Sequence, residues 1–372
     1  MSKPTIAMLP GDGVGAEVLA AARIVLDRLE LDAEYRYGDV GWRFWCEEGD
    51  ALPPRTLEVI EESQCALFGA ITSRPQLEAE QDLDARLRGK GLTYTSPIIR
   101  LRQHLDLHTN LRPCKSFPGN PCSHGEDVDL VVFRENTEGM YAGVEFGPVP
   151  PAVWKTLGDH NEKARRFSTI PPEDAAISLR IMTRQACRTI VSSAFDFARA
   201  HGRRHVTVVD KPNVLRCTGG ILIEEARKAA RDYPGIPLRE ANIDYQCMAL
   251  VASPRDHDVL VAENLFGDIL SDLSAQLVGG AGFAPSANLG DTYALFEPVH
   301  GSAPDIAGKN IANPVAMLLS VRMMLDWLGE NARAARLEAA VAEVIRAGSP
   351  WTPDMGGTAS TLEMAGAVAD RC

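Results

Sequence analysis

The chain has 372 residues, of which 45% are hydrophobic and 24% are charged, and this length predicts two domains with a sizeable buried core. No apolar run reaches the roughly 20 residues that a membrane-spanning helix needs, and the first residues lack a secretory h-region, so we expect a water-soluble, cytoplasmic protein without a membrane partner. The net charge of -12 argues against a nucleic-acid partner, because phosphate binding needs a cationic surface. The eight cysteines lack zinc-type spacing and are expected to be free thiols.

The opening segment has the pattern of a βα unit. A strand is predicted at 4–9, a glycine turn at 11–15 and a helix at 17–29. The turn GDGVG lacks the G-x-G-x-x-G spacing, so an ordinary Rossmann fold is not predicted. A second strand-like run at 65–70 leads into a polar, charged stretch at 73–90, which we expect to be a surface insertion.

The middle of the chain predicts a second domain. The loop after Pro113 is rich in Pro, Gly and Ser, as at a passage between domains, and 128–134 is an apolar run of strand length. The proline-rich segment 146–172 shows little alternation, so we expect an exposed arm that serves contact between subunits. Further on, alternating patterns favour an α/β fold with a largely parallel or mixed sheet, with helices at 174–201 and 219–233 around a strand at 204–209.

Two aspartates four residues apart indicate a metal site. Asp268 and Asp272 lie in NLFGDILSDLSAQ, a stretch of helical period, and this spacing puts both carboxylates on one helix face, about 5 to 6 Å apart at Cβ. Like charges so placed repel each other unless a hard cation binds between them, and oxygen ligands suit magnesium or manganese. The alternative is a solvated acidic face, which the apolar neighbours Leu265, Phe266 and Ile269 disfavour.

Three arginines stand near the ends of apolar segments, at Arg102, Arg112 and Arg134. A guanidinium fork binds a carboxylate in bidentate fashion, so three arginines meeting at one point would form a site for a di- or tricarboxylate. The sequence leaves open whether they meet, and each taken singly is more often a surface or ion-paired residue.

A loop of small residues near the C-terminus, EPVHGSAPDIAGK, carries one histidine and one acid, His300 and Asp305. Such a loop brings backbone N–H groups close to phosphates, and an aspartate can accept hydrogen bonds from the ribose hydroxyls of NAD while repelling the 2′-phosphate of NADP. From the residues alone this is a plausible nucleotide loop.

Several long strings resemble the β-decarboxylating dehydrogenases, the family of isocitrate, homoisocitrate, 3-isopropylmalate and tartrate/D-malate dehydrogenases. They span nearly the whole chain: LPGDGVGAEV, LRQHLDLHTNLRP, DLVVFRENTEGMYAG, DKPNVL, NLFGDILSDL and EPVHGSAPDIAGKNIANP. The resemblance implies an α/β, two-domain isocitrate/isopropylmalate dehydrogenase-like fold with a mixed central sheet. It places a large cofactor-side domain at 1–107 and 279–372, and a small dimerisation and metal-site domain at 108–278.

The resemblance also implies roles for matching residues. Arg102, Arg112 and Arg134 would bind the carboxylates of a malate moiety. Tyr141 in GMYAG would supply the proton after decarboxylation, and Lys211 in DKPNVL would act in the neighbouring subunit's site as, or beside, the general base. A homodimer with shared active sites is then the minimum assembly, with a larger oligomer left open.

For the metal and the cofactor, the resemblance implies two further groups of residues. Asp244 in NIDYQCM, from the partner chain, would join Asp268 and Asp272 around Mg²⁺ or Mn²⁺. NAD is favoured over NADP because Asp305-Ile306 stands where NADP-using relatives carry Lys-Tyr. The full set expected to hold the cofactor is Glu297, His300, Gly301, Ser302, Ala303, Asp305, Ile306 and Asn313.

The resemblance implies that the segment TSPIIRLR, which ends at Arg102, selects the substituent on C3 of the substrate. Ser96 resembles the serine of isocitrate and homoisocitrate enzymes, whereas Ile98 and Ile99 resemble the apolar pair of isopropylmalate enzymes. SPIIRLR is most similar to the homoisocitrate type, so we expect NAD-dependent oxidative decarboxylation of a homoisocitrate- or isocitrate-like malate. The alternatives are 3-isopropylmalate, tartrate/D-malate or another specialised 3-substituted malate.

Two alternative functions other than a dehydrogenase remain. A non-catalytic regulatory subunit would lack Tyr141, Lys211 or one of the aspartates, and all are present. A metal-dependent phosphate-ester enzyme would need the acidic pair but not the His300 loop or Tyr141.

Overall fold

The structure, a computed structural model, describes residues 3–372. Its strands are β1 (Thr5–Gly11), β2 (Glu34–Tyr37), β3 (Cys65–Ala70), β4 (Thr109–Lys115), β5 (Asp129–Glu135), β6 (Glu145–Phe146), β7 (Ile177–Ser178), β8 (Val206–Asp210), β9 (Leu238–Asn242), β10 (Val259–Ala262), β11 (Pro285–Leu289) and β12 (Ala294–Pro298). Its α-helices are α1 (Gly15–Arg28), α2 (Trp42–Glu48), α3 (Pro54–Glu61), α4 (Gln76–Asp82), α5 (Pro97–His104), α6 (Pro151–His160), α7 (Glu162–Arg165), α8 (Arg184–Ala200), α9 (Thr218–Ala229), α10 (Ile243–Ala252), α11 (Asn264–Leu277), α12 (Val315–Trp327), α13 (Asn331–Ala347) and α14 (Thr361–Ala369). The 3₁₀ helices are η1 (Met140–Ala142), η2 (Pro172–Asp174), η3 (Ala230–Asp232), η4 (Pro254–Asp256), η5 (Ala281–Phe283) and η6 (Pro353–Met355). Between residues 3 and 372, no helix combines the length and apolar character needed to cross a membrane.

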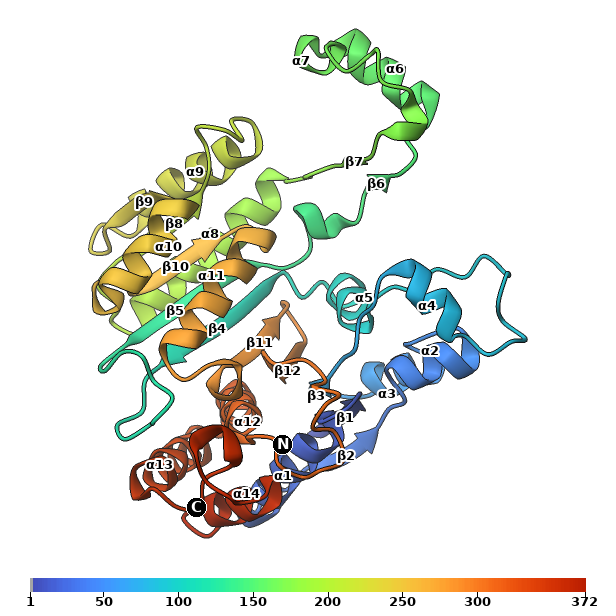
Figure 1. Ribbon diagram of the computed structural model, residues 1–372. Helices are drawn as coiled ribbons and strands as arrows, with labels where there is room; N and C mark the ends of the chain where they lie inside the picture. Colours follow the sequence, from blue (N-terminus) through green and yellow to red (C-terminus); the bar gives the residue numbers. More distant parts are fainter. Residues whose placement is uncertain (1–2) are drawn as a thin grey trace.

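Ten strands form one mixed sheet in the order β2-β1-β3-β12-β11-β4-β5-β10-β8-β9 (Figure 1). Within this sheet, β11 is antiparallel to both β12 and β4, and β4 is antiparallel to β5. All other neighbouring strands of the sheet run parallel. The mixed α/β sheet predicted from the sequence is confirmed, and the central antiparallel strands distinguish it from an ordinary Rossmann fold. In the middle of the sheet Asn110 pairs with Asn288 on one side and Arg134 on the other, so the three side chains share one face.

Helices cover both faces of the sheet. Around β1, β3, β11 and β12 one core packs against α1, α12, α13 and α14, while the opposite face packs against α3 and α5. Around β5, β8 and β10 one core packs against α8 and α9, and the opposite core against α10 and α11. The predicted domain boundaries at 107/108 and 278/279 separate most members of these two pairs of cores, but Phe117, within 108–278, packs in the core around β1 and α1. Because the ten strands form one continuous sheet, the division into two domains stays a prediction.

The segment between β6 and β7 projects from the body as a thin arm with α6 and α7 at its tip (Figure 1). β6 and β7 pair antiparallel near its base, and neither tip helix contains a buried residue. The predicted segment 146–172 lies in this projection, and its contact with another subunit stays a prediction. The helices in the arm were not predicted; α6 begins with Pro151, which suits the first helical position because its missing N–H needs no partner there.

Two expectations need correction in detail. The helix predicted at 174–201 begins only at Arg184, because Thr183 Oγ1 accepts a hydrogen bond from Ala186 N at 3.2 Å and caps the helix there. The segment 73–90 is largely exposed, yet it contains α4, and the carbonyl of Ala79 accepts a hydrogen bond from the buried indole of Trp45 at 2.7 Å. All eight cysteines are free, as expected.

A glycine substitution tests the close approach of β1 and β3. A Cβ added at Gly11, where φ is +69°, would lie 1.8 Å from the carbonyl oxygen of Ala70, so Gly11→Ala should lower the free energy of unfolding by about 3 kcal/mol. The matched control is Gly366→Ala in α14, where an added Cβ meets nothing within 4 Å and should raise stability by about 0.5 to 1 kcal/mol. Urea unfolding followed by circular dichroism measures both. Equal stability of Gly11→Ala and the parent would contradict the packing.

Candidate active site

Three buried arginines meet on the sheet face that α5 and α11 cover. Arg102 of α5, Arg112 of β4 and Arg134 of β5 have exposed fractions of 6%, 7% and 1%. Arg112 Nη1 lies 3.3 Å from Asp268 Oδ1, and Arg134 Nη1 donates to the same oxygen. Arg102 Nη2 pairs instead with Glu297 Oε1 at 3.2 Å. The structure thus brings together the three arginines whose convergence the sequence left open.

Two asparagines of the central strands fix the guanidinium groups from beneath. Asn288 Oδ1 accepts hydrogen bonds from Arg102 Nε and Asn110 Nδ2, both at 2.9 Å. Asn110 Oδ1 in turn accepts from Arg112 Nε at 2.6 Å. The sequence reasoning missed both asparagines, although Asn110 stands two residues before Arg112 in a strand and therefore lies on the same face.

Helix α11 supplies two more supporting groups. Asn264 Oδ1 accepts from Arg134 Nε at 2.9 Å and from Nη2 at 2.7 Å, and Ser271 Oγ accepts from Arg112 Nη1 at 2.6 Å. Asn264 precedes Asp268 by four residues, so helical spacing alone was a usable signal that it faces the same site.

Tyr141 completes the contacts of Asp268. Its hydroxyl donates to Asp268 Oδ2 at 2.6 Å, and the Arg134 guanidinium lies 5.0 Å from its ring centroid. Burial and the Asp268 carboxylate raise the pKa of Tyr141. Burial would raise the pKa of Asp268 too, but the charges of Arg134 and Arg112 outweigh it and lower that pKa. At neutral pH the pair is therefore a carboxylate and a protonated phenol, which can act as a proton donor.

The burial of Arg134, together with Arg112 and Arg102, lowers the pKa of its guanidinium. Even lowered to about 9, this pKa leaves the group charged at neutral pH, where Asp268 pairs with it.

The residues present fit a divalent cation. Asp268 and Asp272 both face Arg112 Nη1, at 3.3 and 3.2 Å, and their donor atoms are the carboxylate oxygens that Mg²⁺ and Mn²⁺ prefer. The three guanidiniums are matched by Asp268, Asp272 and Glu297, so the cluster is close to neutral and a dianionic substrate would call for added positive charge. Across residues 3–372 no group of three acidic, histidine or cysteine side chains is arranged to hold an ion.

Lys211 and Asp244 lie together, apart from this cluster. Lys211 follows β8, Asp244 is in the first turn of α10, and Lys211 Nζ donates to Asp244 Oδ1. The Asp244 side chain is 66% exposed, that of Lys211 25%, and the hydrogen bond from Lys211 lowers the pKa of Asp244. One chain thus presents this pair at its surface, as residues donated to a second subunit would be, and their role stays a prediction.

The loop at 300–309 packs against the glycine turn of the first βα unit. Val14 N donates to Ser302 O at 2.9 Å, and Thr72 Oγ1 donates to Ser302 Oγ at 2.7 Å. A Cβ at Gly13 would lie 1.9 Å from Ser302 O, so only glycine allows this approach. The carboxylate of Asp12 accepts from Thr72 N at 2.9 Å. The GDGVG turn, a weak signal in the sequence, shapes the candidate cofactor loop.

The side chains of this loop differ in how free they are to bind a cofactor. His300 Nε2 is buried without a hydrogen-bond partner, the kind of orphaned polar atom that a bound heterocycle would satisfy. Asn313 is already engaged, donating to Asp354 Oδ2 at 3.0 Å and accepting from Val315 N at 3.0 Å. Glu297 belongs to the arginine cluster instead, since it pairs with Arg102. Exposed or half-buried positions are held by Gly301, Ala303, Asp305 and Ile306. The loop fits a nucleotide, and the individual roles stay predictions.

The substrate-reading segment precedes and opens α5. Ser96 stands just before Pro97 at the helix start, with its hydroxyl free of any capping hydrogen bond. Ile98 is buried with an exposed fraction of 8%, whereas Ile99 is only half-buried. Ser96 and Ile99 are thus the more accessible of the predicted selectivity residues.

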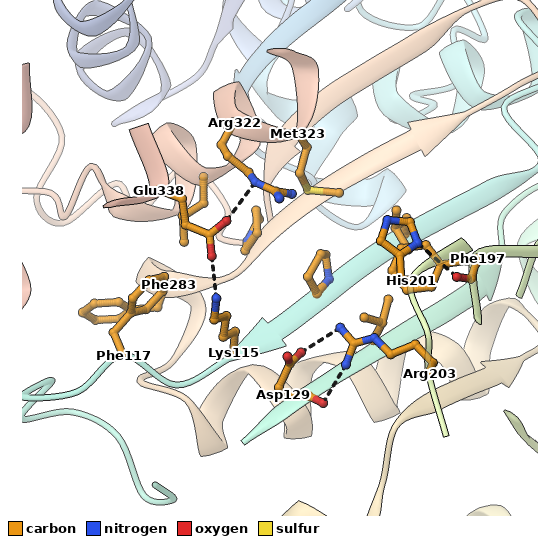
Figure 2. A pocket seen from close by; sticks show the side chains of 15 residues that line it. Lys115, Phe117, Asp129, Phe197, His201, Arg203, Phe283, Arg322, Met323 and Glu338 are labelled. Carbon is orange, nitrogen blue, oxygen red and sulfur yellow. Dashed lines mark hydrogen bonds and ion pairs between the residues drawn. The ribbon is translucent and has the colours of Figure 1, made fainter. Parts of the chain in front are cut away.

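A hollow of about 180 Å³ lies behind the arginine cluster, on the opposite face of β4 (Figure 2). Leu111, Pro113 and Lys115 line it, whereas Arg112 between them points to α11, as strand alternation requires. Its rim charges are paired with one another, as Figure 2 shows for Lys115–Glu338, Arg322–Glu338 and Arg203–Asp129. It contains none of the predicted site residues and is not the candidate active site.

Known proteins resemble this chain over almost its whole length. The isocitrate/isopropylmalate dehydrogenase family model matches residues 5–368. The chain is 42% identical to 3-isopropylmalate dehydrogenase of Methanothermobacter thermautotrophicus, over 99% of this chain and 98% of that protein. It is 41% identical to isocitrate/homoisocitrate dehydrogenase of Thermus thermophilus, over 98% of this chain and 97% of that protein.

A longer relative and a solved structure extend the comparison. The chain is 42% identical to DlpA of Legionella pneumophila over 99% of its length, and spans 58% of that protein. Isocitrate dehydrogenase from Methylococcus capsulatus superposes with a TM-score of 0.86 at 38% identity, over 99% of both chains. The chain belongs to the isocitrate/isopropylmalate dehydrogenase family, which confirms the family and the fold that the sequence strings predicted.

The pH dependence of stability tests the environment of His300. Burial lowers the pKa of His300 from its ordinary value of 6.5. Below pH 6.5 the histidine is therefore protonated in the unfolded chain but stays neutral in the folded chain, so the free energy of unfolding decreases as the pH is lowered. Between pH 7.5 and 5.5, His300→Asn should lose less stability than the parent, by at most about 1.4 kcal/mol. Urea unfolding at both pH values measures this. His160→Asn, at an exposed position of α6, is the control, and an identical pH dependence in the parent and His300→Asn would contradict the assignment.

Proposed function

We propose that this chain is an NAD-dependent, divalent-cation-dependent oxidoreductase that oxidises a 3-substituted malate at C2 and releases its C3 carboxylate as carbon dioxide. The observation that carries the proposal is the contact set of Asp268. Its two oxygens accept hydrogen bonds from Arg112, Arg134 and Tyr141. Two anion-binding arginines and a proton donor, Tyr141, thus meet at one carboxylate that is itself a candidate cation ligand.

Different side chains would serve different steps of the reaction. A bound cation would withdraw electrons at the C2 oxygen, and NAD would accept the hydride from C2. The arginines hold the substrate carboxylates, and because a guanidinium stays protonated it orients the C3 carboxylate without giving it a proton. As the C3–carboxylate bond breaks, its electron pair becomes the C2–C3 double bond, and Tyr141 returns a proton to C3. Hydroxy acid and NAD⁺ thus give 2-oxo acid, carbon dioxide and NADH.

The acceptor for the C2 hydroxyl proton comes from a second copy of the chain. In one chain Lys211 and Asp244 contact each other rather than Asp268 or Tyr141, so we infer that the partner subunit's Lys211 acts as, or beside, the general base that takes the C2 hydroxyl proton, which as a base it can do only as the neutral amine. The partner subunit's Asp244 would complete the ligand set. The exposed Asp244 side chain suits donation across an interface. The functional unit proposed is a homodimer with two shared sites.

For the substrate, we propose a homoisocitrate- or isocitrate-like malate. The half-buried Ser96 hydroxyl makes no capping hydrogen bond and can hydrogen-bond a polar substituent on C3, which supports this choice. The half-buried Ile99 is the feature that would favour 3-isopropylmalate instead. NAD is proposed because an exposed Asp305 carboxylate would repel a 2′-phosphate.

An absorbance assay at 340 nm tests the activity. With Mg²⁺ or Mn²⁺ present, isocitrate, homoisocitrate, 3-isopropylmalate, D-malate and tartrate are each offered with NAD or NADP. We expect turnover with NAD, carbon dioxide release equal to NADH formed, and loss of activity with EDTA that Mn²⁺ restores. A chain inert toward the whole panel would refute the enzyme assignment and favour a regulatory subunit.

A mixed dimer tests the shared site. Lys211→Met and Asp268→Asn homodimers should both be inactive, whereas a heterodimer purified through two different tags should retain about half of the parent activity per dimer, because one of its sites receives Lys211 and Asp268 intact. Tyr141→Phe replaces Asp268→Asn in a second pair, in case loss of the carboxylate beside buried Arg134 impairs folding. An inactive heterodimer in both pairs, or an active monomer, would contradict the proposal.

A further inference from the structure

An ion cluster outside the residues given a role above lies where the arm returns to the body. Arg180 follows β7, and its side chain is 9% exposed. It faces Asp210, which is fully buried, and Glu263, which is 1% exposed. A single guanidinium is thus shared by two buried carboxylates.

The first carboxylate holds the segment that presents Lys211. Arg180 Nη2 donates to Asp210 Oδ2 at 2.6 Å, and Asp210 Oδ1 accepts from the backbone N–H of Lys211 at 2.6 Å. Arg180 Nη1 also donates to Thr218 Oγ1 at 3.1 Å. A Cβ added at Gly219 would lie 2.4 Å from Asp210 Oδ1. The end of β8 and the start of α9 are therefore fixed around this one ion pair.

The second carboxylate holds the start of α11. Glu263 Oε1 accepts from Phe266 N at 2.8 Å and caps the helix that carries Asp268 and Asp272. Its other oxygen lies 3.5 Å from Arg180 Nε. The Arg180 guanidinium also lies 5.2 Å from the ring centroid of Phe266. Arg180 thus contacts the first turn of the helix that carries both aspartates.

The backbone next to Arg180 holds the Tyr141 segment. Gly139 N donates to Ile181 O at 2.7 Å, and Ile181 N donates to Gly139 O at 3.3 Å. Gly139 stands two residues before Tyr141, and a Cβ there would lie 2.7 Å from Glu263 Oε2. Three segments that carry functional groups therefore meet at residues 180 and 181.

We propose that Arg180 is a positioning residue that sets the geometry of Lys211 relative to Tyr141 and Asp268. The inference rests on the proposed function, in which Lys211 serves the partner's site while Tyr141 and Asp268 serve their own. Arg180 then joins parts of two different active sites. A displacement of residues 180 and 181, where the arm returns to the body, would therefore change the geometry of both sites. Arg180 contacts neither set of reacting groups directly, so its effect passes through Asp210, Glu263 and the backbone.

Arg180→Lys is the informative variant. Lysine keeps the positive charge between the two carboxylates, but a single ammonium lacks the fork that spans Asp210 and Thr218. Arg180→Met would leave two buried carboxylates without a cation and is expected to fold poorly. The matched control is Arg184→Lys, four residues further on, whose side chain is 52% exposed and pairs with Glu224 and Glu225.

Steady-state kinetics give the first readout, on protein shown by circular dichroism to be folded. Arg180→Lys should lower kcat about 10- to 100-fold while KM for the hydroxy acid and NAD changes less than about threefold, because Arg180 touches neither ligand. Asp210→Asn should likewise lower kcat with little change in KM. The kcat of the double variant should not fall below that of the less active single variant, because both changes break the same Arg180–Asp210 ion pair. A kcat within twofold of the parent, or losses that multiply in the double variant, would overturn the proposal.

Hydrogen–deuterium exchange gives a readout that needs no turnover. In Arg180→Lys, peptides covering 207–213 and 262–268 should both exchange faster than in the parent, while Arg184→Lys should match the parent. Faster exchange in neither peptide, or in only one of them, would overturn the inference. A parent inert toward every substrate would refute the proposed function, and the exchange result would still decide the role of Arg180 as the link between the two segments.

Discussion

The carboxylate of Asp268 is the interaction on which the rest of the site depends. Two buried guanidiniums would be costly without a counter-charge, and Asp268 provides it while also accepting the Tyr141 hydroxyl. The central antiparallel strands bring these groups together: β4 and β5 carry the arginines side by side, and α11 lies across them. Gly267 permits that approach, since a Cβ there would lie 2.7 Å from the Arg134 side chain.

Much of the fold was predictable because it depends on local patterns. The apolar run at 65–70 is a fully buried strand with those same bounds, and the alternation after the arm gave α8, β8 and α9. The predicted start of α8 was too early because residues 177–178 pair with β6 in the arm, a tertiary contact that no local pattern records. Thr183, which caps the observed start, is by contrast a local signal in the sequence. The prolines of 146–172 predict irregular chain, yet α6 begins with Pro151, because proline suits the first turn of a helix. The short α7 begins instead at the N-cap Asn161, whose side chain accepts hydrogen bonds from Lys163 N and Ala164 N.

The site was predictable in its charged residues and not in their supports. Arg102, Arg112 and Arg134 carry an obvious chemistry, so each could be named before its position was known. Asn110 and Asn288 bring two of these arginines into one network, but amide side chains are common and carry no signal until strand pairing places them side by side. The position of Lys211 beside Asp244 likewise depends on the ends of β8 and β9 lying next to each other.

The chain order of these cores bears on how the protein is made. The core around β1 and α1 is completed by residues after 282, including α12, α13 and α14, and α1 packs directly against α14. The buried residues of the cores around β5 and α11 all lie within 114–278. At a synthesis rate of about 5 to 20 residues per second, the N-terminal hundred residues wait roughly 10 to 55 s for their partners between residue 283 and the end of α14 to be synthesised. During that interval the face of β1 and β3 that α1 shares with α12, α13 and α14 lacks its C-terminal partners, so the core begun first is completed last.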